Sequence, residues 1–264
     1  MPLRVDPTFR EALTTANRPL IGMWVCSGSP LVAEICADSG LDWLLIDAEH
    51  SPNGLESLLA QLQAVHGYAA TPLVRPPSAD TVTIKQYLDL GVQNLLVPMI
   101  DTAAEAAAVV RAVSYPPAGV RGVGSALARA SRWNRVVDYL DVARETIAVF
   151  VQIESSAAVG NVEAILSTPG IDGIFVGPSD LAASMGLLGQ QGHPDVIAAV
   201  ERCISAASAA GVKVGVNAFA PELARRYLAQ GADFILVGAD VQLLARGSEK
   251  LAVDHIPTTN TKDA

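Results

Sequence analysis

The stretch GLDWLLIDAEHSPNG at residues 40–54 contains the unit that decides the fold. It begins with a Gly-x-Asp phrase, continues as a short apolar run, and ends abruptly in the ionisable residues Asp47, Glu49 and His50. A short run that is apolar on both faces is typical of a strand buried in a parallel sheet. The stretch therefore raises the question of why three ionisable side chains follow a buried strand.

The same unit recurs along the chain, where apolar runs alternate with Ala- and Leu-rich amphipathic stretches. The apolar runs indicate parallel strands, and the amphipathic stretches between them indicate helices. The predicted strands are residues 20–25, 42–47, 71–75, 94–99, 147–154, 172–177, 212–217 and 233–238. The predicted helices are residues 30–39, 54–66, 80–90, 102–113, 156–167, 194–210 and 221–230.

The number of these units predicts the architecture. Eight β/α units in 264 residues favour the α/β class and a single-domain (β/α)8 TIM barrel over residues 1–254, with a loose polar tail at 255–264. An open, doubly wound sheet is the alternative, but no Gly-x-Gly-x-x-Gly phrase follows the first predicted strand. Residues 114–146 lengthen the connection after the fourth strand, and long connections of this kind lie at the catalytic end of a barrel.

Composition and charge disfavour several classes of partner. The net charge is −9, the sequence pI is near 4.9, and no Lys- or Arg-rich run occurs, so we expect no nucleic-acid or anionic-membrane surface. Three cysteines without a Cys-x-x-Cys pair indicate reduced thiols and a cytoplasmic protein. We expect neither a signal peptide nor a transmembrane helix, because the chain lacks the apolar runs that these segments need.

Polar side chains gather where the predicted strands end. Active sites of (β/α)8 barrels are built at the C-terminal ends of the strands, which we call the rim. The ionisable residues after the second strand therefore lie where a barrel carries out its chemistry. The candidates at the rim are Trp24, Asp47, Glu49, His50, Arg75, Gln152, Glu154, Gly177, Ser179, Asp180, Asn217, Gly238 and Asp240.

Two of these carboxylates form a candidate metal site. Gln152 and Glu154 are two residues apart and share the interior face of a strand, where a carboxylate needs a partner. Glu154 and Asp180, on adjacent strands, suit Mg²⁺, Mn²⁺ or Co²⁺ together with water and substrate oxygens. In the alternative interpretation, Glu154 pairs with Arg75 and Asp180 only caps a helix.

The remaining candidates each have a catalytic and a structural interpretation. Asp47 lies three residues before His50 and is placed to orient its imidazole, as in pairs of a base and its orienting group, whereas Glu49 either joins the site or caps the next helix. Arg75 either stabilises an oxyanion or forms a structural ion pair. Trp24 either walls the pocket or belongs to the core. The GPSD phrase at 177–180 offers free backbone N–H groups to a substrate carboxylate.

The lysines argue against one kind of carbonyl chemistry. A Schiff-base aldolase needs a lysine at the C-terminal end of a strand. Lys213 lies near the start of the seventh predicted strand, and Lys85 lies in a predicted helix. If the site acts on a carbonyl compound, we therefore expect a metal ion to polarise it.

Several ordered phrases together resemble one known family. They are LDWLLIDAEHSPN (41–53), PLVRPP (72–77), VQIES (151–155), GIDGIFVGPSDLAASMG (170–186) and GADFILVGAD (231–240). Over residues 22–251 the chain is similar to the pyruvate-dependent class II aldolases of the HpcH/HpaI family. The resemblance implies a (β/α)8 barrel whose last helix swaps between subunits, a homohexamer built as a trimer of dimers, and a divalent metal ion, Mg²⁺, Mn²⁺ or Co²⁺, on Glu154 and Asp180.

The resemblance also implies roles for single residues. His50 matches the catalytic histidine, with Asp47 close by, and Arg75 matches the arginine beside the enolate oxygen. Gln152 matches a glutamine of the site. Gly177, Ser179 and Asp180 match the turn whose backbone N–H groups bind the pyruvate carboxylate. Ser179 stands where the family more often has alanine, which leaves this backbone role intact, whereas the phrase CSGS at 26–29 leaves the choice of aldehyde open.

The expected reaction is reversible cleavage of a 4-hydroxy-2-oxo acid into pyruvate, or a close 2-oxo acid, and an aldehyde, through a metal-stabilised enolate. The expected partners are these small molecules. A CoA-thioester lyase of the citrate-lyase-β or malyl-CoA type is an alternative, disfavoured by the lack of a basic surface for CoA phosphates. A phosphate-handling barrel would need a glycine-rich cup after the last two strands, and a non-catalytic barrel would hold a metal ion without turnover.

Overall fold

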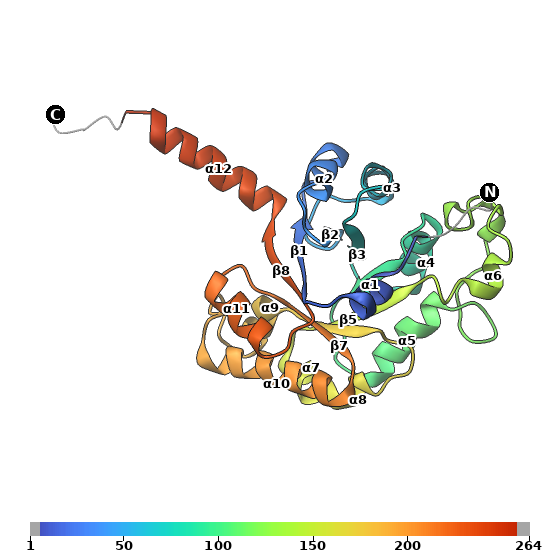
Figure 1. The fold of residues 1–264 in the computed structure, drawn as a ribbon. Coiled ribbons are helices and arrows are strands. Elements are labelled where there is room, and N and C mark those ends of the chain that lie inside the picture. The colour runs from blue at the N-terminus through green and yellow to red at the C-terminus, as the bar shows by residue number, and fades with distance from the viewer. Residues whose placement is uncertain (1–5, 258–264) are drawn as a thin grey trace.

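Eight parallel strands close into a barrel in the computed structural model, which describes residues 6–257 (Figure 1). The strands follow one another around the barrel in chain order, and β1 pairs with β8 through registers such as Ile21 with Ile235. The (β/α)8 prediction is confirmed, and the open sheet is excluded. The strands are β1 (Leu20–Val25), β2 (Trp43–Asp47), β3 (Thr71–Arg75), β4 (Asn94–Val97), β5 (Ala148–Ile153), β6 (Gly173–Val176), β7 (Lys213–Asn217) and β8 (Phe234–Ala239).

Most helices surround the strands, and their bounds differ in places from the sequence prediction. Helices α1, α6, α9 and α12 lie outside the predicted helical ranges, and the predicted helix 156–167 is divided at Asn161. The α-helices are α1 (Phe9–Thr15), α2 (Pro30–Ala37), α3 (Leu55–Ala64), α4 (Thr81–Asp89), α5 (Ala103–Val113), α6 (Tyr139–Val142), α7 (Ser156–Gly160), α8 (Val162–Leu166), α9 (Pro178–Ser184), α10 (Pro194–Ala210), α11 (Pro221–Ala229) and α12 (Asp240–His255). The connection 114–146 also contains the 3₁₀ turns η1 (Ser125–Leu127) and η2 (Arg129–Ser131).

Aromatic rings fill the interior of the barrel towards its N-terminal end. Phe9 of α1 packs against Trp43, Phe150 and Phe234, with ring centroids 5.2–5.5 Å apart. Glycine makes room for these rings, since a Cβ on Gly215 would overlap the Phe234 ring. The short helix α1 therefore plugs the barrel, and a capping box at Thr8 fixes its start.

Three aspartates of the recurring Gly-x-Asp phrase tie neighbouring strands together at the N-terminal end of the barrel. Each carboxylate accepts a hydrogen bond from the first residues of the strand before it, and each also pairs with a cation. Asp42 accepts from the Ile21 N–H at 2.8 Å and pairs with Arg18. Asp172 accepts from the Val149 N–H at 2.7 Å and pairs with Arg10. Asp233 accepts from the Val214 N–H at 2.9 Å and pairs with Lys213. The aspartate of the Gly-x-Asp phrase thus connects two neighbouring strands by a hydrogen bond.

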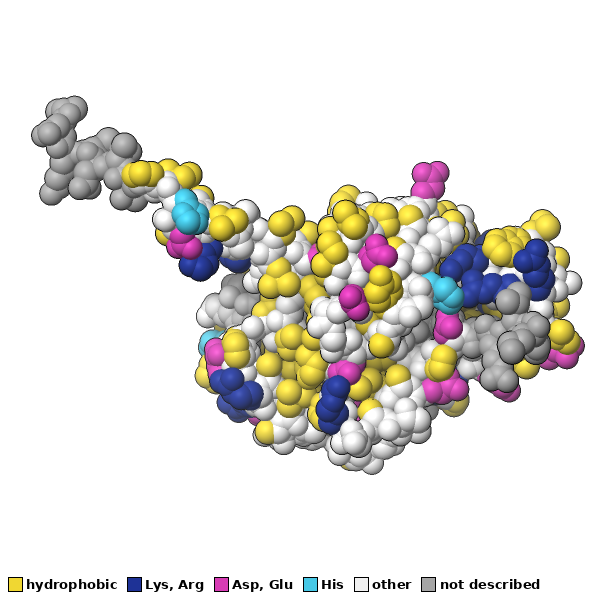
Figure 2. Space-filling model, turned by 45° about the horizontal axis from the view of Figure 1, so that its top comes forward, with side chains coloured by type: hydrophobic (Ala, Val, Ile, Leu, Met, Phe, Trp, Pro, Cys, Tyr) yellow, Lys and Arg dark blue, Asp and Glu magenta, His cyan; other side chains and the backbone are white. Residues whose placement is uncertain are grey.

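The last helix, α12, extends away from the barrel (Figure 1). Its only buried residue is Asp240, and Figure 2 shows hydrophobic side chains along this exposed helix. Leu244 and Val253 are 71% and 81% exposed. The helix ends at His255, one residue into the predicted loose tail, and residues 258–264 of that tail lie outside the described residues. Among the described helices, none has the length and apolarity to cross a membrane.

Candidate active site

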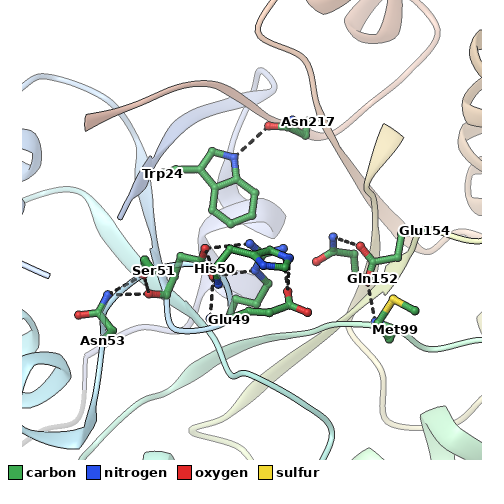
Figure 3. A network of polar contacts seen from close by, with 11 residues as sticks. Trp24, Glu49, His50, Ser51, Asn53, Met99, Gln152, Glu154 and Asn217 are labelled. Carbon is green, nitrogen blue, oxygen red and sulfur yellow. Dashed lines mark hydrogen bonds and ion pairs between the residues drawn. The ribbon is translucent and has the colours of Figure 1, made fainter. Parts of the chain in front are cut away.

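The predicted site residues converge on the rim of the barrel. Asp47 and Arg75 are the last residues of β2 and β3 and stand directly opposite each other in the strand register. Glu154 follows β5, and Asp180 lies in the first turn of α9 after β6. Parallel strands end at one edge, so distant parts of the sequence meet there. Figure 3 shows part of this network from close by.

Arg75 is the centre of one half of the site. Its Nε and Nη2 atoms donate to the two carboxylate oxygens of Asp47 at 2.8 and 2.9 Å, and its Nη1 lies 3.0 Å from Glu49 Oε2. The Trp24 ring stacks on the guanidinium at 4.3 Å, and Trp24 Nε1 donates to Asn217 Oδ1 at 2.9 Å. Burial lowers the pKa of Arg75, but Asp47 and the charges of Glu49 and Glu154 outweigh it and raise the pKa overall.

Asp47 holds the loop that carries His50. Its carboxylate accepts hydrogen bonds from the backbone N–H groups of Glu49 at 3.1 Å and of His50 at 3.3 Å. The predicted contact between Asp47 and the imidazole is not among the hydrogen bonds of the described residues. Instead, Glu49 Oε2 lies 3.8 Å from His50 Nε2 (Figure 3), and the His50 side chain is 67% exposed. The imidazole therefore has Glu49 beside it and solvent access for a substrate.

Glu154 is the buried carboxylate of the other half of the site. Its Oε1 accepts a hydrogen bond from the Met99 N–H at 2.7 Å, and its Oε2 accepts one from the Gln152 amide. Burial raises the pKa of Glu154 to about 7; the Met99 N–H lowers it, the charges of Glu49 and Asp180 raise it, and Arg75 lowers it. Met99 has a φ of 55°, a conformation that non-glycine residues rarely adopt. The backbone is thus bent so that its N–H reaches the carboxylate.

The turn after β6 fits closely against Glu154. A Cβ on Gly177 would lie 2.7 Å from Gln152 Nε2 and 3.0 Å from Glu154 Oε2, so a larger residue here would displace these two side chains. The Ser179 hydroxyl accepts from Gln191 Nε2 at 3.1 Å. Ser179 and Asp180 are exposed and occupy the first turn of α9, whose N–H groups have no partner within the helix.

The donor set fits a divalent cation. Burial raises the pKa of Glu49, and the charges of Asp47 and Asp180 add to this effect, while Arg75 and His50 oppose it. Among the described residues, the buried Gln152 Oε1 has no hydrogen-bond partner. The carboxylates of Glu154 and Asp180 together with an amide oxygen are the kind of oxygen donors that Mg²⁺ and Mn²⁺ accept. Within residues 6–257, no group of three or more His, Cys, Asp or Glu side chains is arranged to hold a metal ion by itself.

The structure bears out only part of the alternative, non-catalytic interpretations of these residues. The ion pairs of the described residues include none between Glu154 and Arg75, because Arg75 is engaged by Asp47 and Glu49. Asp180 does lie in the first turn of α9, although the N-cap of this helix is Gly177 and makes no side-chain bond. Trp24 is both buried in the barrel and stacked on Arg75. No sequence pattern indicated Met99, which acts through its backbone.

Comparisons with known proteins show which sequences and structures the chain is similar to. A sequence model of the family described as HpcH/HpaI aldolase/citrate lyase matches residues 20–247. The chain is 53% identical to the hydroxypyruvate/pyruvate aldolase of Deinococcus radiodurans, over 95% of this chain and 91% of that protein. It is 52% identical to the 4-hydroxy-2-oxo-heptane-1,7-dioate aldolase of Salmonella paratyphi A, over 92% of both. A crystal structure of a family protein from Burkholderia cenocepacia J2315 superposes with a TM-score of 0.89 at 40% identity, over 93% of this chain and 98% of that one.

Proposed function

The chain belongs to the HpcH/HpaI aldolase/citrate lyase family, and from this premise we propose that it is a metal-dependent pyruvate aldolase. The reaction is reversible cleavage of a 4-hydroxy-2-oxo acid into pyruvate, or a close 2-oxo acid such as hydroxypyruvate, and an aldehyde. The observation that carries the proposal is the group of rim carboxylates, Glu49, Glu154 and Asp180, beside Arg75 and His50. The aldolases at 52–53% identity support it.

Glu154 and Asp180 would hold the metal ion, which is Mg²⁺, Mn²⁺ or Co²⁺. When bound, the ion supplies Lewis acidity that polarises the 2-oxo group of the substrate. The protein contributes the shape of the site: Met99 and Gln152 fix the carboxylate of Glu154 by two hydrogen bonds, and Gly177 allows the turn to approach. The backbone N–H groups of Ser179 and Asp180 would bind the substrate carboxylate.

His50 would transfer the proton, and Arg75 would stabilise the negative charge of the enolate. In cleavage, His50 accepts the C4 hydroxyl proton, the C3–C4 bond breaks, the aldehyde leaves, and pyruvate remains as its enolate. In synthesis, the same histidine accepts a methyl proton of pyruvate. Arg75 stabilises the enolate oxygen, while Asp47 fixes the guanidinium by two hydrogen bonds and Trp24 stacks on it to wall the pocket.

The projecting helix α12 supports an assembled protein. We expect a cytoplasmic homo-oligomer, a hexamer built as a trimer of dimers, in which α12 packs on a second copy of the chain. An isolated helix with Leu243, Leu244, Leu251 and Val253 exposed is the kind of apolar surface that a partner covers. Light scattering on the purified protein tests this proposal; a monomeric mass would contradict it.

Metal removal tests the proposed reaction. Treatment with EDTA should abolish release of pyruvate from 4-hydroxy-2-oxo-heptane-1,7-dioate, followed with lactate dehydrogenase, and Mn²⁺ or Mg²⁺ should restore it. His50→Ala should lower turnover by about 10²-fold or more because the proton acceptor is lost. Full activity after removal of the metal, or a loss of only a few-fold in His50→Ala, would contradict the proposal.

A further inference from the structure

Asp240, at the junction of β8 and α12, is a buried carboxylate bound entirely by backbone N–H groups. Its Oδ1 accepts from the N–H of Cys26 at 2.8 Å and of Val241 at 2.8 Å, and its Oδ2 accepts from the N–H of Ser27 at 3.0 Å. It is 5% exposed, and the ion pairs of residues 6–257 include none to Asp240. These three N–H groups give both oxygens the hydrogen bonds that a buried carboxyl group requires. Asp240 therefore anchors residues 26–29, which we call the β1 loop.

The β1 loop packs against the loop that carries His50. A Cβ on Gly28 would lie 3.2 Å from the Pro52 carbonyl oxygen and 3.4 Å from Asn53 Oδ1, and Gly28 has a φ of +70°. Asn53 in turn donates from its Nδ2 to the carbonyl oxygen of Asp47 at 2.5 Å. The β1 loop that Asp240 anchors therefore lies close beside the His50 loop, while His50 itself is held separately by the hydrogen bond of its backbone N–H to Asp47.

The two halves of the site lie on different strands. The groups proposed for the metal ion and pyruvate, Glu154 and Asp180, follow β5 and β6, whereas the β1 loop and His50 follow β1 and β2. The aldehyde carbon reacts at the methyl carbon of pyruvate and its oxygen receives the proton from His50, so the aldehyde lies on the β1–β2 side. We propose that Asp240 is a positioning residue that sets the aldehyde-binding side of the site by holding the β1 loop against the His50 loop. This inference rests on the proposed aldolase function.

Asp240→Asn is the direct test. Asparagine has one acceptor oxygen, and its NH₂ group would face an N–H donor, so at least one backbone N–H of the β1 loop loses its partner. Two rates are measured with Mn²⁺: exchange of the pyruvate methyl protons in D₂O, which needs no aldehyde, and addition of pyruvate to succinic semialdehyde or glycolaldehyde. We expect the KM for the aldehyde to rise about tenfold, since small displacements of a reacting group are costly. The exchange rate should stay within about twofold, because Asp47 still holds the His50 loop.

Asp233→Asn is the matched control. Asp233 lies just before β8 and accepts from the Val214 N–H at 2.9 Å and from Lys213 Nζ at 2.7 Å, so the variant makes the same chemical change at the opposite end of the barrel. It should leave the ratio of the two rates as in the wild type. Gly28→Ala is a second variant that leaves Asp240 and α12 intact, and it should raise the aldehyde KM in the same way.

The outcomes separate this inference from the proposed function. Absence of metal-dependent exchange in the wild-type protein would reject the proposed function itself. Exchange in the wild type, with both rates lowered equally in Asp240→Asn, would show a purely structural role and overturn the inference. If Asp240→Asn does not fold, Gly28→Ala decides: an unchanged aldehyde KM would overturn the inference, and a raised KM with intact exchange would support it.

Discussion

The two ends of the barrel both carry carboxylates, but these carboxylates are neutralised differently. At the N-terminal end, Asp42, Asp172 and Asp233 each bind a backbone N–H of the neighbouring strand and each has a cation of its own. At the rim, the ion pairs of the described residues involve a single arginine, Arg75, together with His50. Among the described residues, Asp47 and Glu49 take part in these ion pairs, whereas Glu154 and Asp180 have none.

The two groups of carboxylates therefore differ in role: those at the N-terminal end join neighbouring strands, and those at the rim form the candidate site. Hydrogen bonding by Arg18 lowers the pKa of Asp42 and outweighs its partial burial, with help from the Ile21 N–H. Burial raises the pKa of Glu154 to about 7, and the neighbouring charges of Glu49 and Asp180 add to the effect of burial. Carboxylates that are satisfied within the protein stabilise the fold, whereas a crowded, buried carboxylate with its charge only partly compensated is prepared to bind a cation.

The largest effect should follow the loss of the shared cation. Arg75→Ala leaves Asp47 and Glu49 without their partner, so the free energy of unfolding should fall by about 3–5 kcal/mol, as for a broken buried ion pair. Turnover should fall by about 10²–10³-fold because the enolate oxygen loses its donor. Urea denaturation and steady-state kinetics measure the two.

Arg18→Ala, at the other end of the barrel, is the control for Arg75→Ala. The Arg18 side chain is 58% exposed, so solvent already screens its pair with Asp42. Its loss should change the urea midpoint far less than the loss of Arg75 and should leave turnover unchanged. Equal losses of stability in the two variants would contradict the difference between the ends.

One carboxylate from each end gives the next comparison. Glu154→Gln should lower turnover by about 100-fold or more, yet leave the melting temperature unchanged or raised, because it removes a costly buried charge. Asp172→Ala should do the reverse: it leaves the Val149 N–H without its partner, at a cost of about 1–3 kcal/mol, and keeps turnover. If both variants lose stability equally and both keep activity, the distinction between the two ends is wrong.

A smaller effect should appear in the pH dependence of stability. The pKa of Glu154 is about 7 in the folded protein, against 4.5 for an unperturbed glutamate, so the folded state holds the proton more tightly. In metal-free protein, Glu154 therefore favours folding below about pH 4.5, and this contribution is lost as the pH rises through about 7. Glu154→Gln should thus gain stability relative to the wild type between about pH 4.5 and about pH 7, as followed by urea denaturation. A constant difference over that range would count against the raised pKa.

The sequence predicted the parts of the fold that repeat. The alternation of apolar runs and helical stretches located all eight strands, and the rule that polar rim residues cluster brought Asp47, Arg75 and Glu154 into one region. The helix α1 was missed because it is short and its role comes from Phe9 contacting three distant rings. The capping box that begins at Thr8 was the available signal.

The finer geometry of the site depends on contacts between distant residues, which local sequence patterns do not predict. Spacing alone placed Asp47 near the His50 imidazole, but the arginine on the adjacent strand occupies that carboxylate, and Glu49 lies beside the ring instead. Met99 contributes a backbone N–H, which has no side-chain signature. The direction of α12 has no local pattern behind it either, since Asp240 is the only buried residue of this helix.

Exchange of the pyruvate methyl protons in D₂O, followed by proton NMR, tests most directly whether the rim binds a metal ion and makes an enolate of pyruvate. The protein is first stripped of metal, and Mg²⁺ or Mn²⁺ is then added. We predict no exchange in the stripped protein and loss of the methyl signal after addition of either ion. Methyl protons that stay unexchanged with every divalent ion tested would contradict this mechanism.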